Sequence, residues 1–205
     1  MNTAMMKIPK KILEKARRVQ FLLLDVDGVM TDGTIYLDAD GKETKAFNIY
    51  DGSGIHLLRK AGVQVGIITG RQSTIVEHRA RELGITEVHQ RILDKLIVYD
   101  QLLRKYGRLD SEMAYIGDDV IDLPILERVG LSVAVPNAHP DVKKRVDWVT
   151  QKAGGSGAVR EVTDLLLAAR TPSLQASIPS EHGEREGEAP SGFAGGGGDV
   201  SPYKK

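Results

Sequence analysis

Acidic and phosphate-binding side chains stand directly after three apolar segments of this sequence. Asp25 and Asp27 follow the run FLLL, Thr-Gly-Arg (69–71) follows the run VQVGII, and DDVID (118–122) follows MAYIG. If the apolar runs are parallel strands, their carboxyl ends meet at one edge of a sheet and bring these groups together. Lys95, near the start of an intervening helix, could reach the same edge.

This set of side chains suits phosphoryl transfer assisted by a divalent cation. Crowded carboxylates repel one another unless a cation neutralises them. Oxygen donors, in a chain without cysteine, favour Mg²⁺ over zinc. Asp25 could attack phosphorus, Asp27 could act as general acid and base, and Lys95 and the Thr69 hydroxyl could hold the phosphoryl oxygens. We therefore predict a magnesium-dependent phosphatase with an aspartyl-phosphate intermediate on Asp25.

Each of these features alone has an ordinary structural explanation. An Asp-x-Asp sequence is usually a solvated turn, and a Thr after a strand often caps the next helix. Acidic residues after residue 117 favour a helix N-terminus through its dipole, and Lys95 is by default a surface lysine. Their occurrence in this order, each at a strand end or a helix start, favours the functional interpretation.

The remaining pattern predicts an α/β fold: a Rossmann-like parallel sheet with helices on both faces. Continuous apolar runs favour strands that are buried on both sides, and apolar residues at helical spacing lie between them. We expect strands at 21–26, 63–69, 113–117, 131–135 and 147–150. We expect helices at 10–19, 53–61, 73–84, 93–107 and 123–130.

Two segments depart from this alternation. Residues 33–49 contain two strand-like arms around Asp40-Gly41, which predicts a β-hairpin flap over the carboxyl end of the sheet. Residues 171–205 are rich in Gly, Ser, Pro and charge, which predicts a flexible low-complexity tail. The folded phosphatase domain is therefore expected to span residues 1–170.

Composition excludes several classes of protein. The 205 residues carry 28 basic and 28 acidic side chains, and this balance argues against nucleic acid or a membrane surface as the main partner. No apolar run approaches the roughly 18 residues of a membrane span, and residues 1–18 are charged, without a secretory apolar region. We expect a cytoplasmic protein.

Together, the motifs DVDGVMT, IITGR, DKL and GDDVID resemble the four signature motifs of the haloacid dehalogenase-like phosphatase superfamily. Across residues 10–167, the segments FNIYDGSGI, RARELGI, VAVPNAHP and AGGSGAVREV are similar to the 3-deoxy-D-manno-octulosonate 8-phosphate phosphatase family of lipopolysaccharide sugar biosynthesis. The resemblance implies Mg²⁺-dependent hydrolysis of a small phosphorylated sugar acid. It also implies a homotetramer that is assembled through the hairpins and lacks a large cap domain.

The resemblance assigns roles to individual residues. Asp25 would be the nucleophile and a metal ligand, and Asp27 the acid/base residue and a ligand through its backbone carbonyl. Asp118 would complete the metal site, Asp122 would support it, and Thr69 would hold the phosphoryl group with Lys95. Substrate contacts would fall on Asp27, Asn48, Ile49, Tyr50, Asp51, Gly52, His56, Arg71, Arg79, Lys95 and Asp119. Arg71 and Arg79 suit a substrate carboxylate because a guanidinium binds it bidentately.

The match loosens at a few positions, and alternatives follow. Close relatives commonly have Arg at or near Tyr50 and Ser53, Arg in place of Ser156, and Gly in place of Arg91. These differences bear on the sugar and leave an N-acylneuraminate 9-phosphate phosphatase, or a broad sugar-phosphate phosphatase, as alternatives. A catalytically idle interaction subunit is disfavoured because every motif acid is retained. A mutase would need a larger cap, and a phosphonatase a marked Schiff-base lysine.

Overall fold

A computed structural model describes residues 8–171, and its central sheet confirms the predicted α/β class. Six parallel strands lie in the order β5-β4-β1-β6-β7-β8. Their bounds are β1 Phe21–Leu24, β4 Gln64–Ile68, β5 Glu87–His89, β6 Met113–Gly117, β7 Leu131–Ala134 and β8 Trp148–Val149. The helices are α1 Lys10–Arg18, α2 Ile49–Lys60, α3 Thr74–Glu82, α4 Lys95–Tyr106, α5 Leu123–Leu126, α6 Pro140–Lys143 and α7 Ala158–Arg170, with 3-10 turns η2 Asp110–Glu112 and η3 Val120–Asp122.

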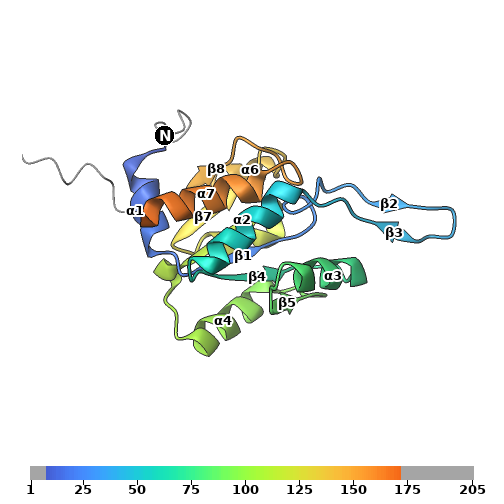
Figure 1. Cartoon of the computed structure of the whole chain (residues 1–205), viewed down its shortest axis with the longest axis horizontal. Helices are drawn as coiled ribbons and strands as arrows, with labels where there is room; N and C mark the ends of the chain where they lie inside the picture. The colour runs from blue at the N-terminus through green and yellow to red at the C-terminus, as the bar shows by residue number, and fades with distance from the viewer. Residues whose placement is uncertain (1–7, 172–205) are drawn as a thin grey trace, which may run out of the picture. The chain divides into compact units, whose positions relative to one another are not determined.

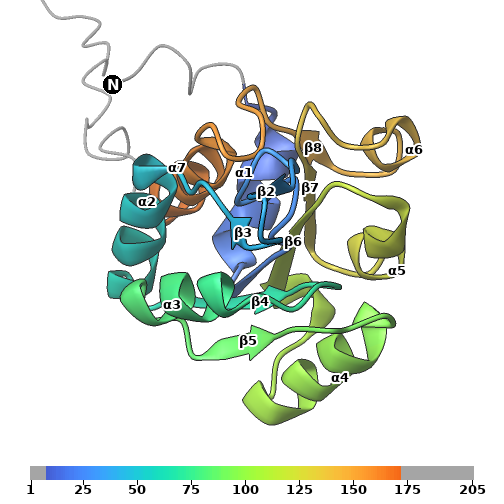
Figure 2. The same ribbon diagram turned by 90° about the vertical axis from the view of Figure 1, so that its right-hand side faces the viewer.

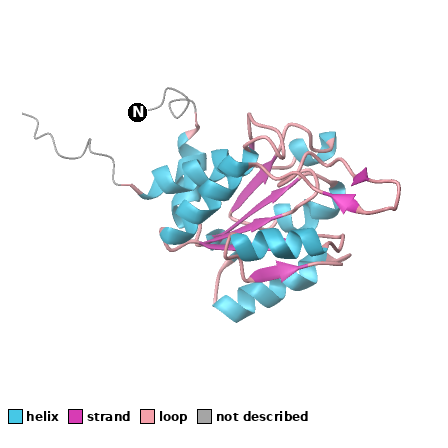
Figure 3. Cartoon of the chain, turned by 45° about the vertical axis from the view of Figure 1, so that its right-hand side comes forward, coloured by secondary structure: helices cyan, strands magenta, loops and turns pink. Residues whose placement is uncertain are grey.

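Helices cover both faces of this sheet (Figure 3). On one face α7 packs between α1 and α2, and on the other α4 packs against α5; Figure 2 shows α2 and α7 on one side of the strands and α4 and α5 on the other. Strands β1 and β6 are buried along their whole length, because helices shield both of their faces. Such burial explains why their sequences are continuous apolar runs instead of alternating ones.

The register of the three central strands brings their carboxyl ends level. Leu24, the last residue of β1, pairs with Ile67 of β4 and with Ile116 of β6. The next residue, Asp25, donates its backbone N–H to the Ile116 carbonyl at 3.0 Å. Residues that follow β1, β4 and β6 therefore emerge side by side, as the sequence predicted.

The segment between β1 and α2 forms the predicted hairpin. Its paired parts are short, β2 Tyr36–Leu37 and β3 Glu43–Thr44, and they run antiparallel. The Asp38 carboxylate accepts N–H bonds from Asp40 and Lys42 and so fixes the turn. Figure 1 shows this hairpin extending away from the body of the domain beyond the sheet, so only its base, not its tip, lies next to the strand ends.

Several elements differ from the sequence prediction. Strand β5 was not predicted, because its three residues, Glu-Val-His, carry no apolar run. Helix α2 begins at Ile49 instead of residue 53, since the Asn48 side chain caps it by accepting from the N–H groups of Tyr50 and Asp51. Helices α6 and α7 were also not predicted. The predicted helix 123–130 is helical only over α5.

The proposed end of the domain at residue 170 stays a prediction. Of the expected tail, 171–205, only Thr171 falls among the described residues. Within residues 8–171, no helix is both long and apolar enough to cross a membrane.

Helix α2 approaches α7 closely at a glycine. A Cβ built on Gly54 would lie 2.2 Å from the Thr163 hydroxyl oxygen and 2.9 Å from Cδ of Arg160. Glycine inside a helix normally lowers stability by about 0.5–1 kcal/mol relative to alanine. Here the missing side chain lets the two helices come together.

We therefore predict that Gly54→Ala lowers the free energy of unfolding by about 1–2 kcal/mol, because overpacking outweighs the gain in helix propensity. Chemical denaturation measures this change. In a Thr163→Ala protein, adding Gly54→Ala should lower the free energy of unfolding by less than it does in the wild type, because the contact with the Thr163 hydroxyl is gone. Ser53→Ala, at the exposed neighbouring position, is the control and should be neutral or slightly stabilising. A stabilised Gly54→Ala protein would contradict the close packing of α2 on α7.

Candidate active site

The side chain of Asp25 is at the centre of the strand-end cluster. It is 6% exposed, and one carboxylate oxygen accepts the N–H of Val26 at 2.7 Å. The other oxygen lies 3.1 Å from the ammonium nitrogen of Lys95. Burial raises the pKa of Asp25 to about 6, while the charge of Lys95 opposes this rise. Asp25 is thus held by two donors in a largely dry position.

Lys95 is the first residue of α4, and its side chain is buried beneath the strand ends. Its ammonium group contacts the Asp122 carboxylate at 2.7 Å and the Tyr115 hydroxyl at 3.1 Å, besides Asp25. Burial alone would lower the pKa of Lys95, but Asp25 and Asp122 outweigh it and raise the pKa above its usual value. The lysine therefore remains a cation inside the protein.

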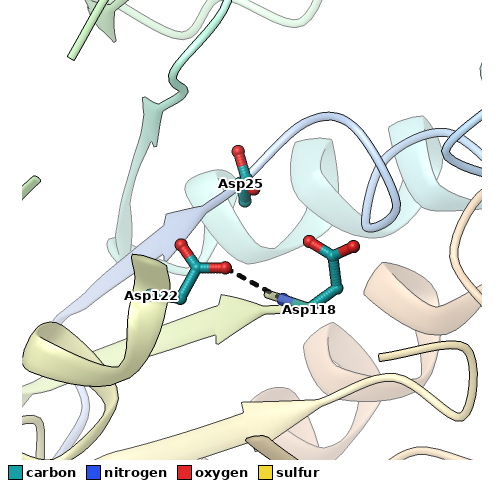
Figure 4. Close-up of side chains that lie close together, drawn as sticks. All are labelled: Asp25, Asp118 and Asp122. Carbon is teal, nitrogen blue, oxygen red and sulfur yellow. Dashed lines mark hydrogen bonds between the residues drawn. The ribbon is translucent and has the colours of Figure 1, made fainter. Parts of the chain in front are cut away.

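Asp122 belongs to the turn after β6 and has no exposed surface. One of its oxygens accepts from Lys95 and from the Tyr115 hydroxyl, and the other accepts the backbone N–H groups of Asp118 and Asp119. Figure 4 shows the bond that joins it to Asp118. Because protein donors occupy both oxygens, Asp122 fixes the loop and the lysine.

Asp118 faces the cluster with a free carboxylate (Figure 4). Oxygens of Asp25, Asp118 and Asp122 lie within 4.8 Å of one another, and Oδ1 of Asp118 is buried without a hydrogen-bond partner. Burial, followed by the charges of Asp25 and Asp122, raises the pKa of Asp118 to about 8. Lys95 contacts two of these three carboxylates, Asp25 and Asp122, so the negative charge of the cluster is only partly neutralised.

The backbone at Gly28 makes room for that carboxylate. Gly28 has φ +90°, and a Cβ there would lie 2.0 Å from Oδ2 of Asp118. Asn137, from the loop after β7, donates to the Gly28 carbonyl at 2.8 Å and accepts the N–H of Gly154 at 2.9 Å. The loop after β1 is therefore fixed on two sides against β6 and β7.

The Thr-Gly-Arg segment follows β4 on the other side of Asp25. Thr69 is 2% exposed, and its N–H donates to His89 while its carbonyl accepts from Ile92. These bonds hold the loop at the sheet edge, where the sequence placed it. Arg71 is more exposed, and its guanidinium donates to Glu43 of the hairpin at 2.6 Å.

Asp27 is turned toward the hairpin. Its Oδ1 accepts a hydrogen bond from the Lys45 ammonium group, and Oδ2 lies 3.9 Å from Nε of Arg71. Lys45 also lies 3.4 Å from Glu43. Four charged groups, two acidic and two basic, therefore connect the base of the flap to the loops after β1 and β4.

The residues predicted to contact substrate fall into two groups. In the first group, Arg79 donates to the Asn48 carbonyl at 3.4 Å, and a Cβ on Gly52 would lie 2.4 Å from its guanidinium. Ile49 and Tyr50 are largely exposed beside them. The start of α2, Arg79 and the hairpin base are thus joined in one region.

The second group consists of Asp51, His56 and Asp119, whose positions do not by themselves indicate substrate contact. Asp51 is buried, and its Oδ1 accepts the N–H of Arg160 in the first turn of α7 at 2.7 Å; burial raises its pKa to about 6, opposed by the N–H groups of Arg160 and Gly157. His56 and Asp119 are exposed, and Asp119 caps the turn η3. A substrate role for the residues of both groups stays a prediction.

Sequence reasoning missed four residues around the site: Tyr115, Asn137, Glu43 and Lys45. Tyr115 reads as one more apolar residue of a buried strand. Asn137 and Lys45 contact the site from loops that are distant in sequence. Only the type of Lys45, a cation on the second strand-like arm of the predicted hairpin, could have drawn attention to it.

The family model for haloacid dehalogenase-like hydrolases matches residues 84–162. The 3-deoxy-D-manno-octulosonate 8-phosphate phosphatase of Escherichia coli K12 is 50% identical over 159 residues, which cover 78% of this chain and 85% of that protein. The enzyme of Salmonella typhi is equally identical over the same shares.

Solved structures of such enzymes superpose on this chain. The Yersinia pestis phosphatase is 47% identical, with a TM-score of 0.79 over 80% of this chain and 88% of its own. The Moraxella catarrhalis enzyme, solved with magnesium, phosphate and KDO, is 42% identical, with a TM-score of 0.78 over 80% of this chain and 94% of its own. With half of the aligned residues identical over most of both chains, this protein belongs to the 3-deoxy-D-manno-octulosonate 8-phosphate phosphatase family of haloacid dehalogenase-like hydrolases.

Proposed function

We propose that this chain is a cytoplasmic, magnesium-dependent phosphatase that converts 3-deoxy-D-manno-octulosonate 8-phosphate to the free sugar acid and phosphate, in lipopolysaccharide sugar biosynthesis. The observation that carries this proposal is the buried pairing of Asp25 with Lys95, which holds a carboxylate nucleophile beside a cation. The 50% identity to the Escherichia coli enzyme supports the choice of substrate.

The donor set at the strand ends fits Mg²⁺. Asp118 has a buried oxygen without a partner, and its pKa is raised to about 8 by burial and the neighbouring carboxylates. A hard divalent cation prefers such oxygen ligands. Asp25, Asp118 and the backbone carbonyl of Asp27 would hold it, while Asp122 is occupied by internal donors. When bound, the ion supplies charge neutralisation at the transferring phosphoryl group.

The protein groups then divide the reaction between them. Asp25 attacks phosphorus, and the bond from phosphorus to the sugar oxygen breaks while Asp27 gives that oxygen a proton. Water then attacks the phosphorus of the aspartyl-phosphate, Asp27 takes its proton, and phosphate leaves with Asp25 restored. Lys95 and the Thr69 hydroxyl hold the equatorial phosphoryl oxygens.

The other end of the substrate lies toward the start of α2 and the two arginines. Arg71 and Arg79 would pair with the sugar acid carboxylate, and residues Asn48 to Gly52, of which Ile49 and Tyr50 are exposed, would contact its hydroxyl groups. Arg71 is bonded to Glu43 in this structure, so binding would exchange that partner for the substrate.

A second candidate substrate is N-acylneuraminate 9-phosphate. The observation that favours it is the absence of Arg at Tyr50, Ser53 and Ser156, positions that are all exposed. A different pattern of surface cations would suit a different acid group or pose. The catalytic residues would be unchanged.

The proposal includes a homotetramer. The hairpin displays Ile35, Tyr36 and Leu37 at 53%, 45% and 62% exposure, and adjacent exposed apolar side chains on a projecting element suit contact with another copy.

The substrate assignment predicts a ranked activity. With Mg²⁺, phosphate release should be faster from 3-deoxy-D-manno-octulosonate 8-phosphate than from N-acetylneuraminate 9-phosphate or hexose phosphates. Asp25→Asn should lower kcat by at least about 10³-fold because it removes the nucleophile. Asp40→Asn, at the exposed hairpin turn, is the matched control. Preference for the nine-carbon acid would favour the second candidate substrate. No phosphate release from any of these esters would refute the proposed phosphatase activity.

The raised pKa of Asp118 predicts how stability depends on pH without metal. Its folded pKa of about 8 exceeds the unfolded value, so between those values folding takes up a proton and stability falls as pH rises toward 8. Asp118→Asn should therefore raise the metal-free Tm at pH 8.5 by roughly 2–4 °C. Mg²⁺ should raise the Tm of the wild type and not of this variant. Equal Mg²⁺ stabilisation of both proteins in thermal melts would exclude Asp118 as a ligand.

The tetramer predicts a hairpin dependence. Replacing Tyr36 and Leu37 by Ser should reduce the mass measured by light scattering to that of smaller species, because the apolar contact is lost. Leu109→Ser, at another exposed position (69%), should leave the mass unchanged. A wild-type monomer in solution would refute the proposal.

A further inference from the structure

Lys45 is an unusual lysine for a projecting hairpin. It lies on the returning arm directly after β3, yet its side chain is only 3% exposed. Its ammonium group donates to Oδ1 of Asp27 and lies 3.4 Å from Oε1 of Glu43. A desolvated cation is retained where it has partners that compensate for lost water, and here both partners are carboxylates next to the strand ends.

The contact leaves the two oxygens of Asp27 in different surroundings. Oδ1 is bound by Lys45, whereas Oδ2 lies 3.9 Å from Nε of Arg71, beyond hydrogen-bond length. The side chain of Asp27 is 26% exposed, so it faces the open side of the cluster. The terminal torsion of an Asp side chain is soft, and a fixed cation on one oxygen restricts it.

We propose that Lys45 is a positioning residue for Asp27: its bond to Oδ1 orients the carboxyl group so that Oδ2 faces the ester oxygen of the substrate. This inference rests on the proposed function, in which Asp27 protonates the leaving sugar oxygen. Because Lys45 belongs to the flap, the position of the flap base sets the geometry of the acid/base residue. Glu43 and Arg71 complete the connection through their 2.6 Å bond.

A series of phosphate esters separates positioning from other roles of Lys45. An alkoxide leaves with a proton from Asp27, whereas 4-nitrophenolate is a weak base and leaves without one. The ratio kcat/KM reports on the steps from free enzyme and free substrate up to the breaking of the ester bond, and it excludes the later hydrolysis of the aspartyl-phosphate. The esters are 3-deoxy-D-manno-octulosonate 8-phosphate, glycerol 3-phosphate without a carboxylate, and 4-nitrophenyl phosphate.

Lys45→Met keeps the length of the side chain and removes its charge. We expect kcat/KM to fall on the order of 10- to 100-fold for both alkyl esters, and by less than about threefold for the aryl ester. Lys45→Arg should recover much of the loss, because it restores a donor to Oδ1. Lys42→Met, at the exposed turn of the same hairpin, should match the wild type on all three esters.

Other outcomes would overturn the inference. A loss confined to the sugar acid ester would mean that Lys45 binds the substrate carboxylate. An equal loss on all three esters would mean that Lys45 only orders the flap. Unchanged kcat/KM values for Lys45→Met would refute the positioning role of Lys45 while leaving the proposed function intact. A wild type inactive on both alkyl esters would refute the proposed function and this inference with it.

Discussion

The ion pair between Lys95 and Asp25 is the interaction on which the site depends. Three carboxylates lie within 4.8 Å of one another, and burial by itself would drive protons onto them. Lys95 enters the cluster from the first turn of α4 and contacts Asp25 and Asp122 together. One buried cation thus stabilises the charge on the nucleophile and its support, whereas the pKa of Asp118 is raised to about 8 by burial and by the charges of Asp25 and Asp122.

The arrangement of the strands makes this crowding possible. Asp25 follows the central strand β1, between β4 and β6, so its neighbours on both sides also come from strand ends. Space for the carboxylates comes from glycines: side-chain atoms of Asp118 would overlap a Cβ on Gly28, and those of Asp122 would overlap one on Gly117, at 2.7 Å. Sheet register and missing side chains together allow the three carboxylates to lie within 4.8 Å of one another.

Sequence reasoning succeeded where the physics is local. Continuous apolar runs located β1, β4 and β6, and the rule that parallel strands end together was enough to bring Asp25 and Asp118 to one place. It failed where the decisive contact is distant or the element short. Strand β5 has only three residues, too few for a periodic pattern. The pairing of Lys45 with Asp27 spans 18 positions through a hairpin, and no periodic pattern predicts it.

Exposure and backbone conformation distinguish the positions at which this chain departs from the pattern expected for its family. Tyr50, Ser53 and Ser156 are exposed, so their side chains vary without disturbing the core. Arg91 is different: its φ is +60°, a conformation that glycine adopts freely and that strains other residues. The glycine expected there is explained by backbone geometry, whereas the arginines expected at the other three positions are not. Differences in sugar selectivity should therefore arise from the exposed positions, while the exchange at Arg91 acts on the loop before Lys95.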